Sequence, residues 1–307
     1  MITYVHGSIF ESPASVLVNT VNTVGVMGRG IAADFKRLYP EMFRRYQQLC
    51  EEGKLRIGTL WLYRTEHKSV LNFPTKTDWR RPSKPEYVEE GLRTFLQTYE
   101  KAAINSIAFP ALGCGNGGLD FEKQVRPLME RYLSRVAASV FIYPHQGSMQ
   151  VPEHIRPAEM GDWLRSAPED LSFVEVWEDL RKLLGRQRTF RTLAADTEYR
   201  ALYSADPLGI RIVSGSKKWL VPQQDLLDFW QHLRAFGFVS SRDAPSGRER
   251  DTSYIAPVFA ELPYVRVARI AKGYEAFERT PEYALQLTPR SGKAVASGQL
   301  ELISTAS

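Results

Sequence analysis

A chain of 307 residues, 43% hydrophobic and 24% charged, has the composition of a soluble globular protein and is long enough for two domains of ordinary size. No apolar run approaches the roughly 20 residues of a membrane span, and the N-terminal residues lack a signal peptide's features, so we expect a cytoplasmic protein without a membrane partner. Cys50 and Cys114 are the two cysteines, too few for a disulfide framework or a structural zinc site, and a net charge of +5 allows an acidic partner without requiring one.

Short β-rich runs alternate with amphipathic helices over residues 1–165. The predicted strands are ITYVHG, SVLVNTV, TLWLYR, SVLNFP, SIAFPAL and SVFIYP, and helices are expected over residues 31–52, 86–103 and 121–135. This alternation predicts an α/β domain whose largely parallel or mixed sheet is covered by helices on both faces. Residues 1–165 carry 21 Lys and Arg against 17 Asp and Glu, so this part is the better candidate for contact with nucleic acid.

A second, smaller domain follows an irregular, proline-containing segment that we interpret as a linker over residues 156–170. Its predicted elements are a helix in LSFVEVWEDLRKLLG, strands in EYRALYS, GIRIVS and KKWLV, a helix in PQQDLLDFWQHLRAFG, a further helix and the strand YVRVARI. The expected organisation is a first domain over residues 1–155, the linker, an α+β domain without a chemical motif over residues 171–290, and a flexible tail over residues 291–307. Trp219, Phe229 and Trp230 are expected in the core of the second domain rather than at an interface.

Two glycine-rich segments are the most informative feature of the first domain, GVMGRGIAADF at residues 25–35 and PALGCGNGGLD at residues 110–120. Each follows a predicted buried strand, and the first leads into a helix that begins near Ile31. Glycines there let the backbone approach a ligand and aim N–H groups at it, so two converging loops would hold a diphosphate. The Rossmann fingerprint and the Walker A motif are both incomplete in these segments.

Lys76 is the main candidate for chemistry. It follows an apolar run and Pro74, where burial would favour the uncharged amine and suit it to nucleophilic or acid–base catalysis; a solvated surface lysine is an equal alternative. Asn19 and Asn22 lie near the same strand ends, where asparagine is more often a turn residue or a core amide.

A short basic stretch with one aromatic residue follows Lys76. Trp79, Arg80, Arg81 and Lys84 could hold phosphates and stack on a base, although a solvated loop is the simpler interpretation. The five histidines, at positions 6, 67, 145, 154 and 232, have no metal-ligand spacing, so we expect no metal and no other cofactor. Cys114, inside the second glycine segment, is interpreted as a small residue in a crowded turn rather than a catalytic thiol.

The blocks SVLVNTVNTVGVMGRGIAADFK, NFPTK and LGCGNGGLD, in this order, resemble the macrodomain family. Within it they are most similar to the DarG-type antitoxins, which remove ADP-ribose from DNA and oppose DarT-type DNA ADP-ribosyltransferases. The resemblance covers residues 1 to about 155 and implies a three-layer α/β/α macrodomain with a mixed central sheet. It also implies ADP-ribose and ADP-ribosylated single-stranded DNA as ligands, and a DarT-type toxin as the partner of the C-terminal domain.

The resemblance further assigns roles to individual residues. Asn22 would lie beside the distal ribose, and Lys76 would be the catalytic lysine of a metal-independent ADP-ribosyl glycohydrolase. The substrate-binding set would be Ser8, Ile9, Asn19, Asn22, the first phosphate loop of Gly28, Arg29, Gly30 and Ile31, and the second loop of Gly113, Cys114, Gly115, Asn116, Gly117 and Gly118. The DNA flank would meet Trp79, Arg80, Arg81 and Lys84.

Two positions depart from the family's pattern. Ser8 stands where most macrodomains have an aspartate that binds the adenine amino group, and its hydroxyl lacks charge assistance worth ~1 kcal/mol. Gly117 stands where related hydrolases acting on ADP-ribosyl-glutamate have an aspartate that partners the lysine. Lys76 could therefore attack the anomeric carbon, or it could protonate or electrostatically stabilise the leaving thymine while water attacks.

The expected reaction is hydrolysis of the bond between ADP-ribose and a thymine of single-stranded DNA. A module that binds ADP-ribose without turnover, and a hydrolase of ADP-ribosylated protein, are the alternatives. Contact of the second domain with DNA through Arg186, Arg188 and Arg191 is the weakest possibility, because the residues after 165 carry 19 Lys and Arg against 18 Asp and Glu.

Overall fold

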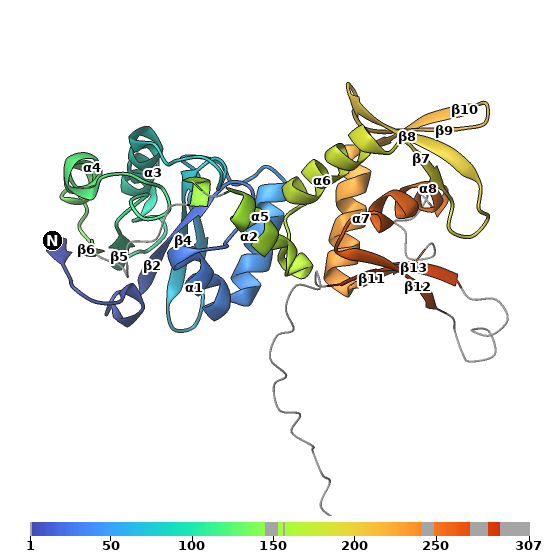
Figure 1. Cartoon of the computed structure of the whole chain (residues 1–307). Coiled ribbons are helices and arrows are strands. Elements are labelled where there is room, and N and C mark those ends of the chain that lie inside the picture. The colour runs from blue at the N-terminus through green and yellow to red at the C-terminus, as the bar shows by residue number, and fades with distance from the viewer. Residues whose placement is uncertain (1, 145–152, 156, 241–248, 271–281, 289–307) are drawn as a thin grey trace, which may run out of the picture. The chain divides into compact units, whose positions relative to one another are not determined.

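The computed structural model describes residues 2–144, 153–155, 157–240, 249–270 and 282–288 (Figure 1). The chain divides into two compact units, Met1–Gly161 and Asp162–Ser307. In the described part of the chain, no helix combines the length and the hydropathy needed to cross a membrane.

The first unit is built on a six-stranded sheet with the order β1-β6-β5-β2-β4-β3. Its strands are β1 (Ile2–Tyr4), β2 (Val16–Asn22), β3 (Trp61–Tyr63), β4 (Ser69–Lys76), β5 (Ser106–Pro110) and β6 (Ser139–Tyr143). All neighbours are parallel except β3, which pairs antiparallel with β4 at the edge. The six strands and the mixed sheet predicted from the sequence are confirmed.

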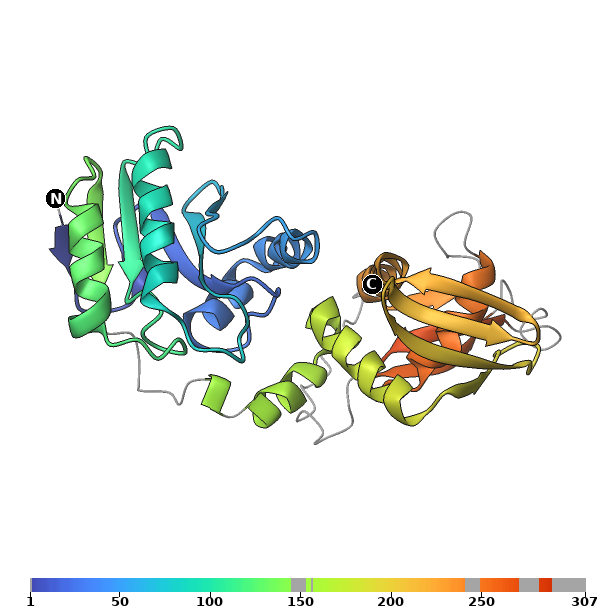
Figure 2. The ribbon, with the colours of Figure 1, turned by 90° about the horizontal axis from the view of Figure 1, so that it is seen from above.

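Helices cover both faces of this sheet. Side chains of β2 alternate between two hydrophobic clusters: Val16 and Val18 face α3 (Pro85–Thr98) and α4 (Arg126–Leu133), whereas Leu17 and Val21 face α1 (Gly30–Leu38) and α2 (Pro40–Glu51). Figure 2 shows α3 and α4 lying side by side on one face. The resulting three-layer α/β/α arrangement confirms the predicted fold class.

One predicted helix is divided in the structure. The segment 31–52 forms α1 and α2, with Tyr39 between them and Pro40 at the first position of α2. A proline has no N–H for the helical ladder and disfavours a helical residue before it, so the chain must begin a new helix there. Short turns complete the unit: η1 (Ile9–Glu11), the π-helical η2 (Phe121–Val125) that precedes α4, and η3 (Glu153–Ile155).

The second unit is α+β, as predicted. A four-stranded antiparallel sheet has the order β10-β9-β8-β7, and a three-stranded antiparallel sheet has the order β11-β13-β12. The elements in chain order are η4 (Pro168–Asp170), α6 (Phe173–Arg186), β7 (Thr189–Arg191), β8 (Glu198–Ala205), β9 (Leu208–Ser214), β10 (Lys217–Pro222), α7 (Gln223–Phe236), β11 (Phe238–Ser240), α8 (Glu249–Ala260), β12 (Val265–Ile270) and β13 (Glu282–Leu287). A further helix, α5 (Pro157–Arg165), forms in the segment that the sequence leaves irregular. The tail over residues 291–307 lies outside the described residues.

Helix α7 supplies the core of the second unit. Phe229 and Trp230 are fully buried, and the Trp230 indole nitrogen donates to the Leu171 carbonyl at 3.1 Å. Trp219 is half-buried, and its indole nitrogen donates to Asp251 Oδ1 at 2.8 Å. These aromatic residues therefore stabilise the fold, since a buried Trp or Phe contributes several kcal/mol, about 3–5 on truncation to Ala.

Candidate active site

The carboxyl ends of the parallel strands place the two glycine loops against one another. Loop 1 (residues 23–29) follows β2, and loop 2 (residues 111–119) follows β5. A Cβ atom at Gly30, where φ is +61°, would lie 2.7 Å from Nδ2 of Asn116 in loop 2. The approach is close enough that a side chain at position 30 would collide with loop 2, so the structure brings together the two segments that the sequence singles out.

Asn22 holds loop 1 in its conformation. Its Oδ1 accepts hydrogen bonds from the backbone of Val24 at 3.1 Å and of Val26 at 3.3 Å, and its Nδ2 donates to the Val26 carbonyl at 2.6 Å. The Tyr46 hydroxyl, on α2, lies 2.8 Å from the Asn22 carbonyl oxygen. These bonds give Asn22 a structural role in addition to the ribose contact that the resemblance implies.

Helix α1 presents its N-terminus to the space between the loops. Arg29 occupies the N-cap position without a side-chain capping bond, and the first turn contains no acidic residue. The first N–H groups of a helix lack intrahelical acceptors and carry part of the positive end of the helix dipole. The end of α1 that meets loop 2 is thus suited to an anionic group.

Loop 2 and Ser83 pack tightly around Gly117. A Cβ atom at Gly117 would lie 2.1 Å from the Gly113 carbonyl oxygen and 2.3 Å from Oγ of Ser83. The Ser83 amide donates to the Gly117 carbonyl at 2.9 Å, which joins loop 2 to the segment after β4. No side chain fits at position 117 in this conformation, so the acidic residue of the related hydrolases cannot be accommodated there.

Unsatisfied polar atoms gather around loop 2. Ser83 Oγ, Asn116 Oδ1 and His154 Nδ1 are buried without a hydrogen-bond partner in the described structure. Such atoms cost about 1–3 kcal/mol each, and native proteins retain them mainly where a ligand, ion or water completes their bonding. The cluster is suited to a polar ligand or to ordered water at loop 2.

Lys76 ends β4 beside the loops. It is a register partner of Asn22 on β2, its side chain is only 6% exposed, and its Nζ donates to the Trp79 carbonyl at 3.3 Å. The Thr23 hydroxyl donates to the Thr77 carbonyl at 2.8 Å, which ties loop 1 to the residue after Lys76. Lys76 is therefore buried rather than on an open surface, as one of the two interpretations of the sequence requires, and it lies beside Asn22 at the start of loop 1.

The basic stretch after Lys76 divides into buried and exposed residues. Trp79 is fully buried, so a base cannot stack on its ring in this conformation, contrary to our expectation. Arg80 lies over that ring at 4.4 Å and pairs with Asp78 at 3.5 Å. Arg81 and Lys84 are exposed, and these two remain available to the flank of a DNA ligand.

Three predicted contact residues lie apart from the loops or beneath the site surface. Asn19 is fully buried, and its Nδ2 donates to Asn72 Oδ1 at 3.0 Å, so its side chain links β2 to β4. The Ile9 side chain is 1% exposed, which leaves only its backbone for a ligand. Ser8 is exposed, and its Oγ accepts from the Phe10 amide at 3.3 Å with one lone pair remaining.

The surroundings of Cys114, in loop 2, and of Asp120, directly after it, indicate structural roles. Burial, with a smaller contribution from Asp120, raises the pKa of Cys114 to about 12, so its thiol is protonated at neutral pH. Asp120 caps the following helical turn, because its Oδ1 accepts from the Lys123 amide at 2.9 Å. Cys114 is consistent with the packing role expected for it.

His154 is the site residue that the sequence does not reveal. A Cβ atom at Gly118 would lie 3.5 Å from the His154 ring. Burial and then the charge of Lys76 lower the pKa of His154 below its ordinary value of 6.5, and a hydrogen bond with the Asn116 backbone opposes that shift. The only signal in the sequence is that His154 follows the last parallel strand, whose carboxyl end lies at the same edge of the sheet.

No group of three or more His, Cys, Asp or Glu side chains suited to a metal ion is present among the residues that the structure describes.

Comparison with known proteins identifies relatives of the first unit. A model of the macro domain family matches residues 18–128. The solved macrodomain of Thermus aquaticus DarG is 41% identical, with a TM-score of 0.45, over 47% of this chain and 99% of that one. The chain belongs to the macrodomain family. Both glycine loops lie within the matched macrodomain.

Longer relatives of this macrodomain protein carry named activities. The DNA ADP-ribosyl glycohydrolase of Mycobacterium tuberculosis is 38% identical over 191 residues, which are 58% of this chain and 54% of that protein. A DNA ADP-ribosyl transferase–DNA ADP-ribosyl glycohydrolase fusion protein of Thermosipho africanus is 39% identical over 45% of this chain and 40% of its own length. DarTG of the same organism, solved with ADP-ribose, is 38% identical with a TM-score of 0.46, over 50% of this chain and 43% of that one.

The macrodomain protein spans about half, or less, of the length of these curated relatives. It is a homologue of DNA ADP-ribosyl glycohydrolases at moderate identity over about half of its own chain.

Proposed function

We propose that this protein is a DNA ADP-ribosyl glycohydrolase that removes ADP-ribose from thymine bases of single-stranded DNA. The observation that carries the proposal is the position of Lys76, a buried lysine that pairs with Asn22 just ahead of loop 1. The start of α1, which follows loop 1, meets loop 2 at Gly30 and Asn116. Identity to DNA ADP-ribosyl glycohydrolases over about half of the chain supports the choice of substrate.

The loops would bind the ADP portion. The diphosphate would lie between the N-terminus of α1, with Gly28, Arg29, Gly30 and Ile31, and the backbone of loop 2 from Gly113 to Gly118. The unsatisfied atoms of Ser83, Asn116 and His154 would complete their hydrogen bonds to the ligand. The adenine would lie near Ser8 and the Ile9 backbone.

The reaction replaces a carbon–nitrogen bond by a carbon–oxygen bond. A water oxygen bonds to the anomeric carbon of the distal ribose while the bond to the thymine nitrogen breaks and its electron pair remains on the base. The base then takes up one proton, and the attacking water releases one. The products are ADP-ribose and unmodified DNA.

Lys76, as an ammonium, would stabilise the negative charge that develops on the leaving thymine. This role is favoured over attack on the anomeric carbon because loop 2 supplies no carboxylate partner: Gly117 has no room for one, and Asp120 caps a helical turn. A preorganised donor of this kind is worth roughly 10²–10³ in rate. Borohydride reduction during turnover distinguishes the roles, because a nucleophilic lysine would be trapped as a covalent ADP-ribosyl adduct and a charge-stabilising lysine would not.

The test of the proposed function compares two substrates. The purified chain is incubated with a single-stranded oligonucleotide carrying ADP-ribosylated thymidine and, separately, with ADP-ribosylated protein, in the presence and absence of EDTA. The proposal predicts release from DNA in both conditions. Release from protein alone would identify a protein hydrolase, binding without release from either substrate would identify a reader module, and loss with EDTA would overturn metal independence.

The second unit would bind a DarT-type toxin. Support comes from the Thermosipho africanus relative, whose name describes a transferase and a glycohydrolase fused in one chain. The expected result is a complex between the full chain and its cognate transferase at micromolar concentration, retained when Lys76 is replaced by Ala. No complex at that concentration would contradict this part of the proposal.

A further inference from the structure

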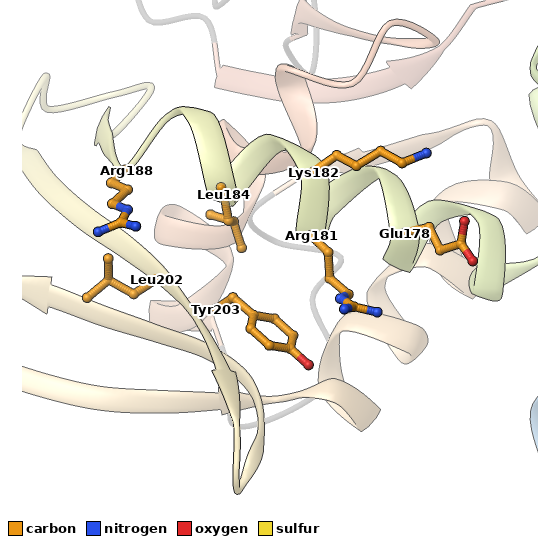
Figure 3. Close-up of a pocket in the computed structure, with 8 residues that line it drawn as sticks. Glu178, Arg181, Lys182, Leu184, Arg188, Leu202 and Tyr203 are labelled. Atoms are coloured by element: carbon orange, nitrogen blue, oxygen red, sulfur yellow. The ribbon is translucent and has the colours of Figure 1, made fainter.

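An open groove lies between α6 and β8 in the second unit (Figure 3). It has a volume of about 690 Å³. Helix α6 lines it with Arg181, Lys182 and Leu184, and strand β8 lines it with Leu202 and Tyr203. Arg188, which directly precedes β7, also lines the groove. The groove belongs entirely to the second unit and is separate from the macrodomain site.

The groove carries positive charge. Arg181, Lys182 and Arg188 form no ion pair with any residue that the structure describes. Neighbouring arginines do: Arg165 pairs with Asp179 at 2.7 Å, and Arg191 pairs with Asp196 and Glu198. Glu178 is the one carboxylate of the lining, and it lies at the opposite end from Arg188 (Figure 3).

An aromatic platform occupies the same groove. Tyr203 is 38% exposed, and the Arg181 guanidinium lies over its ring at 5.2 Å. Figure 3 shows these two side chains pointing toward one another. The buried Trp177 packs against Tyr203 with ring centroids 5.8 Å apart, which holds the platform in place. A planar guanidinium held over an aromatic ring is a surface on which an unpaired base stacks.

Cationic side chains also occupy the sheet face that carries Leu202, whereas Tyr203, the next residue of β8, belongs to the opposite face. Leu202 is the register partner of Arg211, and Arg200 and Lys218 are both register partners of Val213, so these side chains share one face. Arg200, Arg211 and Lys218 are exposed. Residues 178–218 carry nine Lys and Arg against five Asp and Glu, although the whole second part of the chain is nearly balanced.

From this juxtaposition we propose that the groove between α6 and β8 binds single-stranded nucleic acid, with its phosphates on Arg181, Lys182 and Arg188 and an unpaired base stacked on the Arg181–Tyr203 platform. Free cations aligned beside an aromatic platform are the two components of single-strand binding surfaces. A duplex would leave the platform unused, because its bases are already stacked. The proposal is independent of catalysis by Lys76.

The test is fluorescence anisotropy of an unmodified oligothymidine of about 15 nucleotides with the full chain at several salt concentrations. All variants carry Arg81→Ala and Lys84→Ala, which removes from the measurement the two exposed cations assigned to the DNA flank of the macrodomain. In this background Arg181→Ala/Arg188→Ala should weaken binding at least about ten-fold and reduce the slope of log Kd against log salt by about 1.4, since two phosphate contacts are lost.

Matched variants separate charge from stacking. Arg266→Ala/Arg269→Ala removes two exposed charges from β12 in the same unit and should leave both the affinity and the slope unchanged. Tyr203→Ala should weaken binding at least about five-fold without altering the slope, and Tyr203→Phe, which retains the ring and its packing on Trp177, should bind as the parent does.

The proposal would be overturned if Arg181→Ala/Arg188→Ala and Arg266→Ala/Arg269→Ala lost oligonucleotide affinity equally, or if neither lost any. Tighter binding of duplex than of single strands would also overturn it, as would groove variants that lose the cognate transferase but bind the oligonucleotide normally. Equal competition by free nucleotide and by oligonucleotide would mean a nucleotide site and would contradict strand binding. RNA and DNA oligonucleotides of equal length identify the natural strand. Hydrolysis of ADP-ribosylated thymidine mononucleotide by the groove variants should equal that by the Arg81→Ala/Lys84→Ala parent, so failure of the groove proposal leaves the macrodomain reaction unaffected.

Discussion

Replacement of Gly117 by Ala tests the geometry of loop 2 with one methyl group. The new Cβ would lie 2.1 Å from the Gly113 carbonyl oxygen and 2.3 Å from Ser83 Oγ. Relief requires a backbone shift of about 1 Å, and overpacking of this kind costs about 1–3 kcal/mol. Loss of the 2.9 Å bond from the Ser83 amide to the Gly117 carbonyl adds about 1 kcal/mol.

The expected total is about 2–4 kcal/mol against the loop conformation that faces α1. Because the ligand must restore that conformation, ADP-ribose affinity should fall at least about ten-fold, which corresponds to 1.4 kcal/mol. Isothermal titration calorimetry with ADP-ribose measures the change, and circular dichroism verifies that the chain remains folded.

Gly115→Ala is the matched control in the same loop. A Cβ atom at Gly115 would have no neighbour within 4 Å, and its φ is not in the left-handed region. This variant should bind ADP-ribose within about two-fold of the parent, since surface changes are usually within ±0.5 kcal/mol. Equal affinities of the two alanine variants would refute the loop 2 geometry described above.

Three further predictions test other parts of the site. In an NMR titration the pKa of His154 should lie below 6.5 in the parent and rise in Lys76→Ala, because one of its two lowering causes is removed. The parent should therefore lose stability as the pH falls below 6.5, where the unfolded chain takes up the proton first, and His154→Gln should lose less. Cys114→Ser should hydrolyse substrate at the parental rate at neutral pH, since the raised pKa leaves no thiolate to remove; a large decrease would show that the thiol acts. Tyr46→Phe, which deletes the bond to the Asn22 carbonyl, should weaken ADP-ribose binding several-fold by calorimetry, and unchanged affinity would mean that loop 1 does not depend on α2.

The sequence predicts the layers of the first unit because its strands and helices have clear periodicity. It cannot predict that β1 pairs with β6, the last strand of the first unit, since strand order depends on long-range packing. In the second unit the strand β13 and its partners β11 and β12 are less evident, because β11 has only three residues. Pro40 is by itself a sufficient signal for the division between α1 and α2, which the helix predicted over residues 31–52 leaves out.

The glycine loops are the predictable part of the site, since backbone requirements at Gly30 and Gly117 leave a direct mark on the sequence. Trp79 illustrates the opposite case. A tryptophan among basic residues resembles a stacking surface, yet its ring is in the core and only its carbonyl faces Lys76. The sequence does not reveal Ser83 and His154, because they reach loop 2 from separate elements. Ser83 does so through its backbone amide, and His154 through its ring.

In the proposed reaction Lys76 supplies the catalysis, and without it the two loops would only bind ADP-ribose. The measurement is the single-turnover rate of ADP-ribose release from an oligonucleotide with one ADP-ribosylated thymidine, for Lys76→Ala and for the exposed control Lys101→Ala. We expect a loss of at least about 100-fold for Lys76→Ala with ADP-ribose binding retained, and a rate within about three-fold of the parent for Lys101→Ala under saturating substrate. A Lys76→Ala enzyme that releases ADP-ribose at the parental rate would contradict the catalytic role of Lys76.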